Sequence, residues 1–198
     1  MVKFTKLRQT NRGLFKMDKE NKRVEKLCSF YVSEWHLVTM LLPYISHKIE
    51  ENTKVITILE KNIEKNIKTL LQKLNLKTQK EILEIRWKNI NSKKYADIEK
   101  VLNEEVKKSG ENIILINGCK DYIEKNNENV EKWLLKSKTK QAKIINLFEV
   151  TEFNHNIMEI LNTHDRVLNT SGEKEIEEVF EGYVKAERLQ SKKAAGNE

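Results

Sequence analysis

The fold class is decided by two short stretches, Lys54–Glu60, which reads KVITILE, and Asn112–Asn117, which reads NIILIN. Both are almost continuously apolar, which is typical of strands buried on both faces of a parallel sheet. Three more stretches of the chain have strand character: Leu27–Val32, Ile82–Trp87 and Lys143–Val150. The sequence therefore predicts about five strands.

Amphipathic stretches separate the predicted strands. Apolar residues recur at helical spacing over residues 37–49, 63–74, 92–108, 122–135 and 154–163. Ser33 is placed to cap the first helix, and Pro43 lies inside it. Strand and helix alternate at a spacing of roughly 25 to 30 residues, as in right-handed βαβ units. We expect a three-layer α/β domain with about five mainly parallel strands flanked by helices.

Composition excludes several classes of protein. With 198 residues, 38% of them hydrophobic, the chain can bury one core of ordinary size. The longest near-apolar stretch, Leu37–Ile45, is about half of a bilayer span. Two cysteines are too few for a disulfide scaffold and suit a reducing compartment. We therefore expect a cytoplasmic protein.

The net charge of +7 is unevenly distributed along the chain. Residues 1–26 hold nine basic and three acidic side chains, so the rest of the chain is almost neutral. This leader has no sustained apolar period, and we expect a flexible basic arm. A nucleic-acid-binding arm, or one that binds a membrane surface or a partner, is the alternative.

The predicted boundaries place the arm at 1–26, the α/β domain at 27–170 and a charged helix with its tail at 171–198. The last helix, from about Lys174 to Gln190, either packs on the domain or forms a surface for a partner or a homodimer. The apolar stripe proposed for that surface consists of Ile176, Val179, Phe180 and Tyr183.

The sequence motifs of several enzyme classes are absent. It has no G-x-x-x-x-G-K-[ST] and no G-x-G-x-x-G, because every glycine is isolated, and it has no G-x-S-x-G. The histidines show no metal-ligand spacing, so we expect neither metal nor cofactor. Nucleophilic catalysis by Cys28 or Cys119 is the remaining enzymatic alternative, and we expect no enzyme.

Polar and aromatic side chains follow the predicted strands at the edge where α/β domains usually bind ligands. We expect a small-molecule pocket there, with Glu60, Trp87, Glu149 and Thr151 completing the row. The alternative is that these residues are helix caps and turns, and that His164 bonds a terminal carbonyl. The candidate ligand-binding residues are Cys28, Tyr31, Trp35, His36, Asn117, Cys119, Asp121 and His164.

Two segments together resemble the MEDS family, the methanogen/methylotroph sensory domain. Cys28–Tyr31 followed by Leu41–Ile45 is similar to the opening of that family, and Ile160–Leu168 is similar to its closing helix and apolar return. The resemblance spans about residues 27–176. It implies a RecA-like α/β fold without a working phosphate loop, and a sensory role in bacterial signal transduction with small hydrocarbon-derived ligands.

Together these observations predict a non-enzymatic sensory or regulatory module that binds a small molecule, a signalling protein, or both. Members of the resembled family are commonly fused to a kinase or a DNA-binding domain, and neither fits in the remaining length. The expected partner is therefore a separate kinase or transcription regulator. A nucleic-acid-associated regulator that uses the basic arm is the alternative function.

Overall fold

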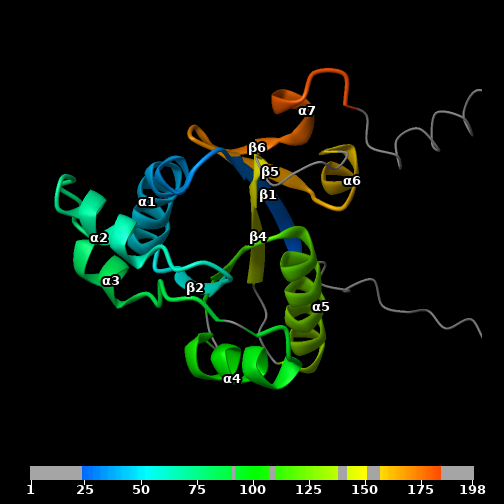
Figure 1. The fold of residues 1–198 in the computed structure, drawn as a ribbon, viewed down its shortest axis with the longest axis horizontal. Helices are drawn as coiled ribbons and strands as arrows, with labels where there is room; N and C mark the ends of the chain where they lie inside the picture. Colours follow the sequence, from blue (N-terminus) through cyan, green and yellow to red (C-terminus); the bar gives the residue numbers. More distant parts are fainter. Residues whose placement is uncertain (1–23, 91, 108–109, 138–141, 151–156, 184–198) are drawn as a thin grey trace, which may run out of the picture.

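The computed structural model describes residues 24–183, apart from residues 91, 108–109, 138–141 and 151–156. Strands and helices alternate along most of the chain (Figure 1). In chain order the elements are β1 (Glu25–Tyr31), α1 (Glu34–Glu50), β2 (Lys54–Leu59), α2 (Glu64–Leu71), α3 (Gln79–Glu84), α4 (Tyr95–Glu105), β3 (Asn112–Asn117), α5 (Lys120–Lys136), β4 (Ala142–Glu149), α6 (Ile157–Asn162), β5 (Arg166–Asn169), β6 (Gly172–Glu175) and α7 (Ile176–Val179).

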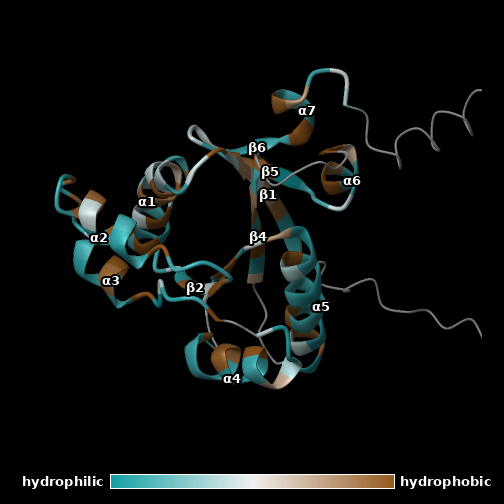
Figure 2. Cartoon of the chain, viewed as in Figure 1, coloured by the Kyte–Doolittle hydropathy of each residue, from teal (hydrophilic) through white to brown (hydrophobic). Residues whose placement is uncertain are grey.

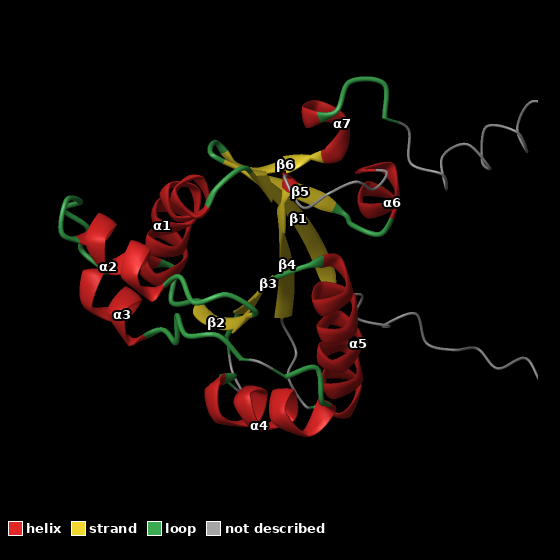
Figure 3. Cartoon of the chain, in the orientation of Figure 1, coloured by secondary structure: helices red, strands yellow, loops and turns green. Residues whose placement is uncertain are grey.

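The strands form one six-stranded sheet in the order β2-β3-β4-β1-β5-β6. All neighbouring pairs are parallel except β5 and β6, which form an antiparallel hairpin. Helices cover both faces of this sheet, with α1, α2 and α3 on one side (Figure 3). The predicted α/β class with a three-layer arrangement is confirmed.

The core divides into two layers because successive strand residues point to opposite faces. Ile113 and Leu115 of β3 pack with α1, α2 and α3, whereas Ile114 and Ile116 pack with α4 and α5. Both layers are apolar, which explains why β2 and β3 read as continuous hydrophobic runs. The helices accordingly carry a hydrophobic side and a hydrophilic side (Figure 2).

The predicted strand at Ile82–Trp87 is wrong. Residues 79–84 form helix α3, and the chain then runs without regular structure. Ile82 and Ile85 are both buried, whereas Leu83 between them is exposed, a three-residue spacing that belongs to a helix. The segment that follows runs along the outer strand, where the backbone N–H of Ile90 donates to the carbonyl of Leu59 at 2.6 Å.

The end of the predicted domain also needs correction. Strand β6 pairs with β5 over residues 172–175, so the sheet continues past residue 170. The predicted helix from Lys174 begins instead as this strand, and helix α7 covers only Ile176–Val179. At the other end, β1 begins at Glu25, slightly before the predicted boundary. The predicted arm, up to residue 23, and the tail from residue 184 lie outside the described residues.

An ion cluster fixes the β5–β6 hairpin to the rest of the sheet. Lys143 of β4 is only 8% exposed, and its Nζ lies 2.8 Å from both carboxylate oxygens of Glu173 in β6. The hydroxyl of Tyr44 in α1 donates to the same carboxylate at 2.7 Å, and Arg166 of β5 donates to it at 3.0 Å. One carboxylate therefore joins a helix and three strands.

None of the helices in the described part of the chain has both the length and the apolar character needed to span a membrane.

Replacing Glu173 with Gln tests this cluster. The change leaves the charge of Lys143 buried with only Glu25, at 3.3 Å, as its acidic neighbour. We expect the free energy of unfolding to fall by about 1–2 kcal/mol, less than for a fully buried pair because the Glu173 side chain remains 12% exposed. Urea denaturation followed by circular dichroism measures this loss, and Glu181→Gln, at an exposed site outside the cluster, is the control.

The loss of stability in Glu173→Gln should depend on pH. Burial alone would raise the pKa of Glu173, but hydrogen bonds from Lys143 and Tyr44 outweigh it and hold the pKa below its ordinary value. A lowered carboxyl pKa contributes stability above the ordinary glutamate range, and this contribution is lost as the pH falls through the lowered pKa. The advantage of the wild type over Glu173→Gln should therefore shrink on acidification, and a constant difference would contradict the prediction.

Candidate functional site

The carboxyl edge of the sheet has its switch point between β1 and β4. The two strands are paired up to Tyr31 and Glu149, so Val32 and Val150 follow at neighbouring positions. From this point β1 continues into α1 on one face of the sheet, and β4 leads toward α6 on the other face. Diverging connections of this kind mark the usual ligand site of an open α/β sheet.

Two predicted residues meet beneath this edge. The side-chain amide of Asn117, at the end of β3, donates to the hydroxyl of Tyr31 at 2.7 Å and to the carbonyl of Leu147 at 3.0 Å. Both side chains are buried. The amide thus links three strands, which is a structural role that satisfies its donors internally.

A second pair joins the end of β2 to the start of α5. The backbone N–H of Cys119 donates to Glu60 at 2.6 Å, and the Cys119 thiol lies 3.5 Å from the other oxygen of the same carboxylate. Glu60 therefore supplies the acceptor at the helix N-terminus that no side chain at the N-cap position provides. Asp121, a predicted site residue, lies exposed in the first turn of α5.

Gly118 makes this approach possible. A Cβ atom at this position would lie 2.6 Å from Glu60 Oε2 and 2.7 Å from Cδ1 of Tyr122. The hydroxyl of Tyr122 donates to the carbonyl of Ile90 at 2.7 Å, which holds the ring in place. Burial, with Glu60 nearby, raises the pKa of Tyr122, so its hydroxyl stays protonated.

The turn from β1 into α1 leaves apolar side chains in contact with solvent. Val32 is 59% exposed and Trp35 is 48% exposed, while Val150 at the end of β4 is 39% exposed. Ser33 caps α1, as predicted, by accepting from the N–H of His36 at 3.2 Å. The Nδ1 atom of His36 accepts from the N–H of Val32 at 3.3 Å, so this predicted residue orders the turn. We call Val32, Trp35 and Val150 the apolar edge.

Cys28 and His164, two of the predicted ligand-binding residues, do not lie at this edge. Cys28 is fully buried within β1. His164 is buried as well, with Nε2 2.9 Å from the amide of Asn146 and Nδ1 2.6 Å from the carbonyl of Ile160. The carbonyl of a helix residue is thus the partner of His164, as in the structural alternative. The structure does not bring Trp35, Asn117 and His164 together in one pocket.

The predicted partner surface is largely part of the core. Ile176 and Tyr183 are buried, and the ring of Phe180 lies edge-on to Phe30 at 5.9 Å. Only Val179 remains exposed. The stripe covers the face of the sheet next to β5, because the short β5–β6 hairpin brings α7 back onto it.

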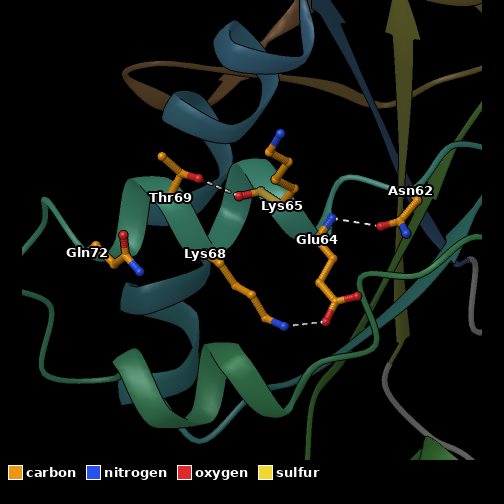
Figure 4. Close-up of a pocket in the computed structure, with 6 residues that line it drawn as sticks. All are labelled: Asn62, Glu64, Lys65, Lys68, Thr69 and Gln72. Carbon is orange, nitrogen blue, oxygen red and sulfur yellow. Dashed lines mark hydrogen bonds and ion pairs between the residues drawn. The ribbon is translucent and has the colours of Figure 1, made fainter.

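Clusters of metal-ligating side chains and hollows are the other features that could hold a ligand. In the part of the chain that the structure describes, no three His, Cys, Asp or Glu side chains gather as a metal site. A polar hollow of about 430 Å³ lies along α2, and none of the predicted site residues lines it (Figure 4). Its lining consists of Asn62, Glu64, Lys65, Lys68, Thr69 and Gln72.

Comparison with known proteins found no match to any protein-family model, any curated protein or any solved structure. The resemblance to the MEDS family, and the RecA-like relationship that it implies, stay predictions.

The two cysteines should differ in their reactivity. Burial raises the pKa of the Cys28 thiol to about 12, whereas Cys119 is partly exposed. At neutral pH we expect iodoacetamide to modify Cys119 at least about a hundredfold faster than Cys28, because Cys28 needs local unfolding. Peptide mass spectrometry measures both rates, and denatured protein is the control. Comparable rates in the folded protein would revive Cys28 as a candidate nucleophile.

Gly118→Ala tests the contact between Glu60 and the start of α5. The added methyl group overlaps the Glu60 carboxylate and the Tyr122 ring, so we expect a loss of about 2 kcal/mol in the free energy of unfolding. Chemical denaturation measures the loss. In a Glu60→Gly background, which removes both the carboxylate and the Glu60 Cβ that would lie 2.8 Å from the added methyl group, the same substitution should cost less, because only the contact with Tyr122 remains. An equal cost in both backgrounds would place the strain at Tyr122.

Proposed function

We propose that this chain is a non-enzymatic regulatory module that works by binding, and that its contact surface is the apolar edge. The observation that carries the proposal is the exposure of Val32, Trp35 and Val150 at the switch point of the sheet. Tryptophan is enriched among the residues that dominate binding energy, and an exposed apolar group next to a rigid sheet suits such a role.

The polar groups near this edge support binding over catalysis. The Tyr31 hydroxyl and the Asn117 amide bond to each other, and the Glu60 carboxylate accepts from the start of α5. These groups hold the edge in shape, so the apolar side chains are the part that faces solvent. Burial also keeps the Cys28 thiol protonated at neutral pH, which disfavours it as a nucleophile.

The sensory role in bacterial signalling rests on the resemblance to the MEDS family. In this proposal the edge receives a small apolar ligand or a side chain of a signalling partner, such as a kinase or a transcription regulator. A cytoplasmic location is part of the proposal and is supported by the two cysteines, both of which are free.

The alternative function, nucleic-acid binding by the basic arm, falls on residues outside the described part of the chain.

Trp35→Ala tests the apolar edge. Because Trp35 is half-exposed, we expect the variant to fold with a free energy of unfolding within about 0.5 kcal/mol of the wild type. Its affinity for a captured partner, or for a ligand found by thermal shift, should fall at least about tenfold. Leu135→Ser is the matched control, because Leu135 is 89% exposed at the last turn of α5, which ends at the opposite edge of the sheet.

Two assays measure the effect. Thermal shift against a library of small apolar metabolites reads out ligand binding, and quantitative affinity capture from a bacterial lysate reads out protein partners. Binding that is lost in Trp35→Ala and kept in Leu135→Ser supports the proposal. Binding that neither variant changes, or the absence of any binding in both assays, overturns it.

A further inference from the structure

A second surface, distinct from the apolar edge, stands out by its charge. Residues 61–80, which include α2 and the start of α3, hold six lysines and a single acidic residue, Glu64. We call these residues the basic segment. Elsewhere in the described part of the chain, acidic side chains outnumber basic ones. The positive charge of the folded part is therefore concentrated in this one region.

The lysines of the basic segment point outward and are mostly unpaired. They repeat the spacing K-x-x-x-K-x-x-K twice, at residues 61, 65 and 68 and again at residues 73, 77 and 80. Lys61 pairs with Glu149 at 3.0 Å, and Lys68 pairs with Glu64 at 2.6 Å. Among the described residues, the remaining four ammonium groups have no ion-pair partner, and all four side chains are exposed.

The apolar side of the basic segment packs on the core, so its lysines lie on the side that faces solvent. Ile67 and Leu71 of α2 and Ile82 of α3 are buried in the core layer that contains α1. The outer side of α2 forms the polar hollow, where Lys65 extends away from the Glu64–Lys68 pair (Figure 4). Besides Glu64, which is paired with Lys68, the side chains that line the hollow are those of lysine, threonine, asparagine and glutamine.

We propose that the basic segment is a docking surface for the phosphate backbone of a nucleic-acid duplex. Lysine, asparagine, glutamine and threonine side chains are among those that contact phosphates in protein–DNA complexes. The acidic character of the remaining described surface repels a polyanion, so the duplex is directed to this segment.

The residue types favour a nucleic acid over an acidic protein. Lysine is depleted at protein–protein interfaces, where aromatic residues and arginine are enriched. The basic segment contains neither an aromatic residue nor an arginine. The lack of aromatic side chains also removes the stacking platform that single strands use, which leaves contacts to a duplex backbone without reading of base sequence.

The test compares two triple variants of the full chain. Lys65→Gln/Lys77→Gln/Lys80→Gln removes three unpaired lysines of the basic segment. Lys93→Gln/Lys94→Gln/Lys100→Gln removes three exposed lysines at and near α4, which packs on the other face of the sheet. Both variants lose the same net charge and keep the basic residues 1–26, so a difference between them reports on the basic segment alone. Circular dichroism checks that both are folded.

Fluorescence anisotropy with a short mixed-sequence DNA duplex, measured over a range of salt concentrations, gives the affinity and its salt dependence. We expect the basic-segment variant to bind at least about tenfold more weakly at low salt. Its slope of log K against log salt should be smaller by about 2.7, roughly 0.9 for each lost phosphate contact. The α4 variant should keep the affinity and slope of the wild type.

Three results would overturn the proposal. The first is no binding of the duplex by the wild type at low salt. The second is an equal effect, or no effect, of the two triple variants, which would assign binding to overall charge or to residues 1–26. The third is displacement of the duplex by polyglutamate as effectively as by unlabelled duplex at equal charge, which would assign the surface to acidic proteins.

Discussion

The position of β1 inside the sheet is the constraint on which the rest of the structure depends. This strand pairs with β4 along its whole length and with β5 on its other side, so it joins the four-stranded block to the C-terminal hairpin. Placing the first strand in the interior forces its connection and that of β4 to leave on opposite faces. The apolar edge lies where they part, and its location is therefore a consequence of strand order rather than of any local motif.

The polar groups close to the apolar edge form hydrogen bonds within the protein and so support the edge. Glu60 lies at the start of α5 in the position that an anionic ligand would occupy in a phosphate-binding α/β protein, and Gly118 provides the space for its carboxylate. The chain thus satisfies this helix terminus with its own side chain. Together with the Tyr31–Asn117 hydrogen bond, this arrangement removes polar donors from solvent and leaves Val32, Trp35 and Val150 exposed.

The features that could be predicted from the sequence are those determined by residues close together in the chain. Strands β2 and β3 were recognisable because burial on both faces requires an uninterrupted apolar run, and the cap at Ser33 because it depends on neighbours three residues away. Strands β5 and β6 escaped prediction because they are short and contain charged residues, and the ion pair of Glu173 with Lys143 of the distant strand β4 helps to fix them. The role of Glu60 escaped prediction for a similar reason, since its partner lies 59 residues away. The edge residues Val32 and Val150 could have been found only from the pairing of β1 with β4.

The two proposed surfaces are physically connected. Asn66 of α2 donates to Glu34 in the first turn of α1 at 2.8 Å, and Trp35 is the next residue along α1. Lys61 at the start of the basic segment bonds to Glu149, which directly precedes Val150. A molecule that moves the first turn of α1 therefore acts on a side-chain hydrogen bond of α2. Any coupling of this kind is reciprocal, so a duplex bound to the basic segment would change the affinity of the apolar edge by the same factor as the edge ligand changes duplex binding. This reciprocity is the property that a regulatory module needs, and the Asn66–Glu34 and Lys61–Glu149 contacts are the side-chain contacts through which it would act.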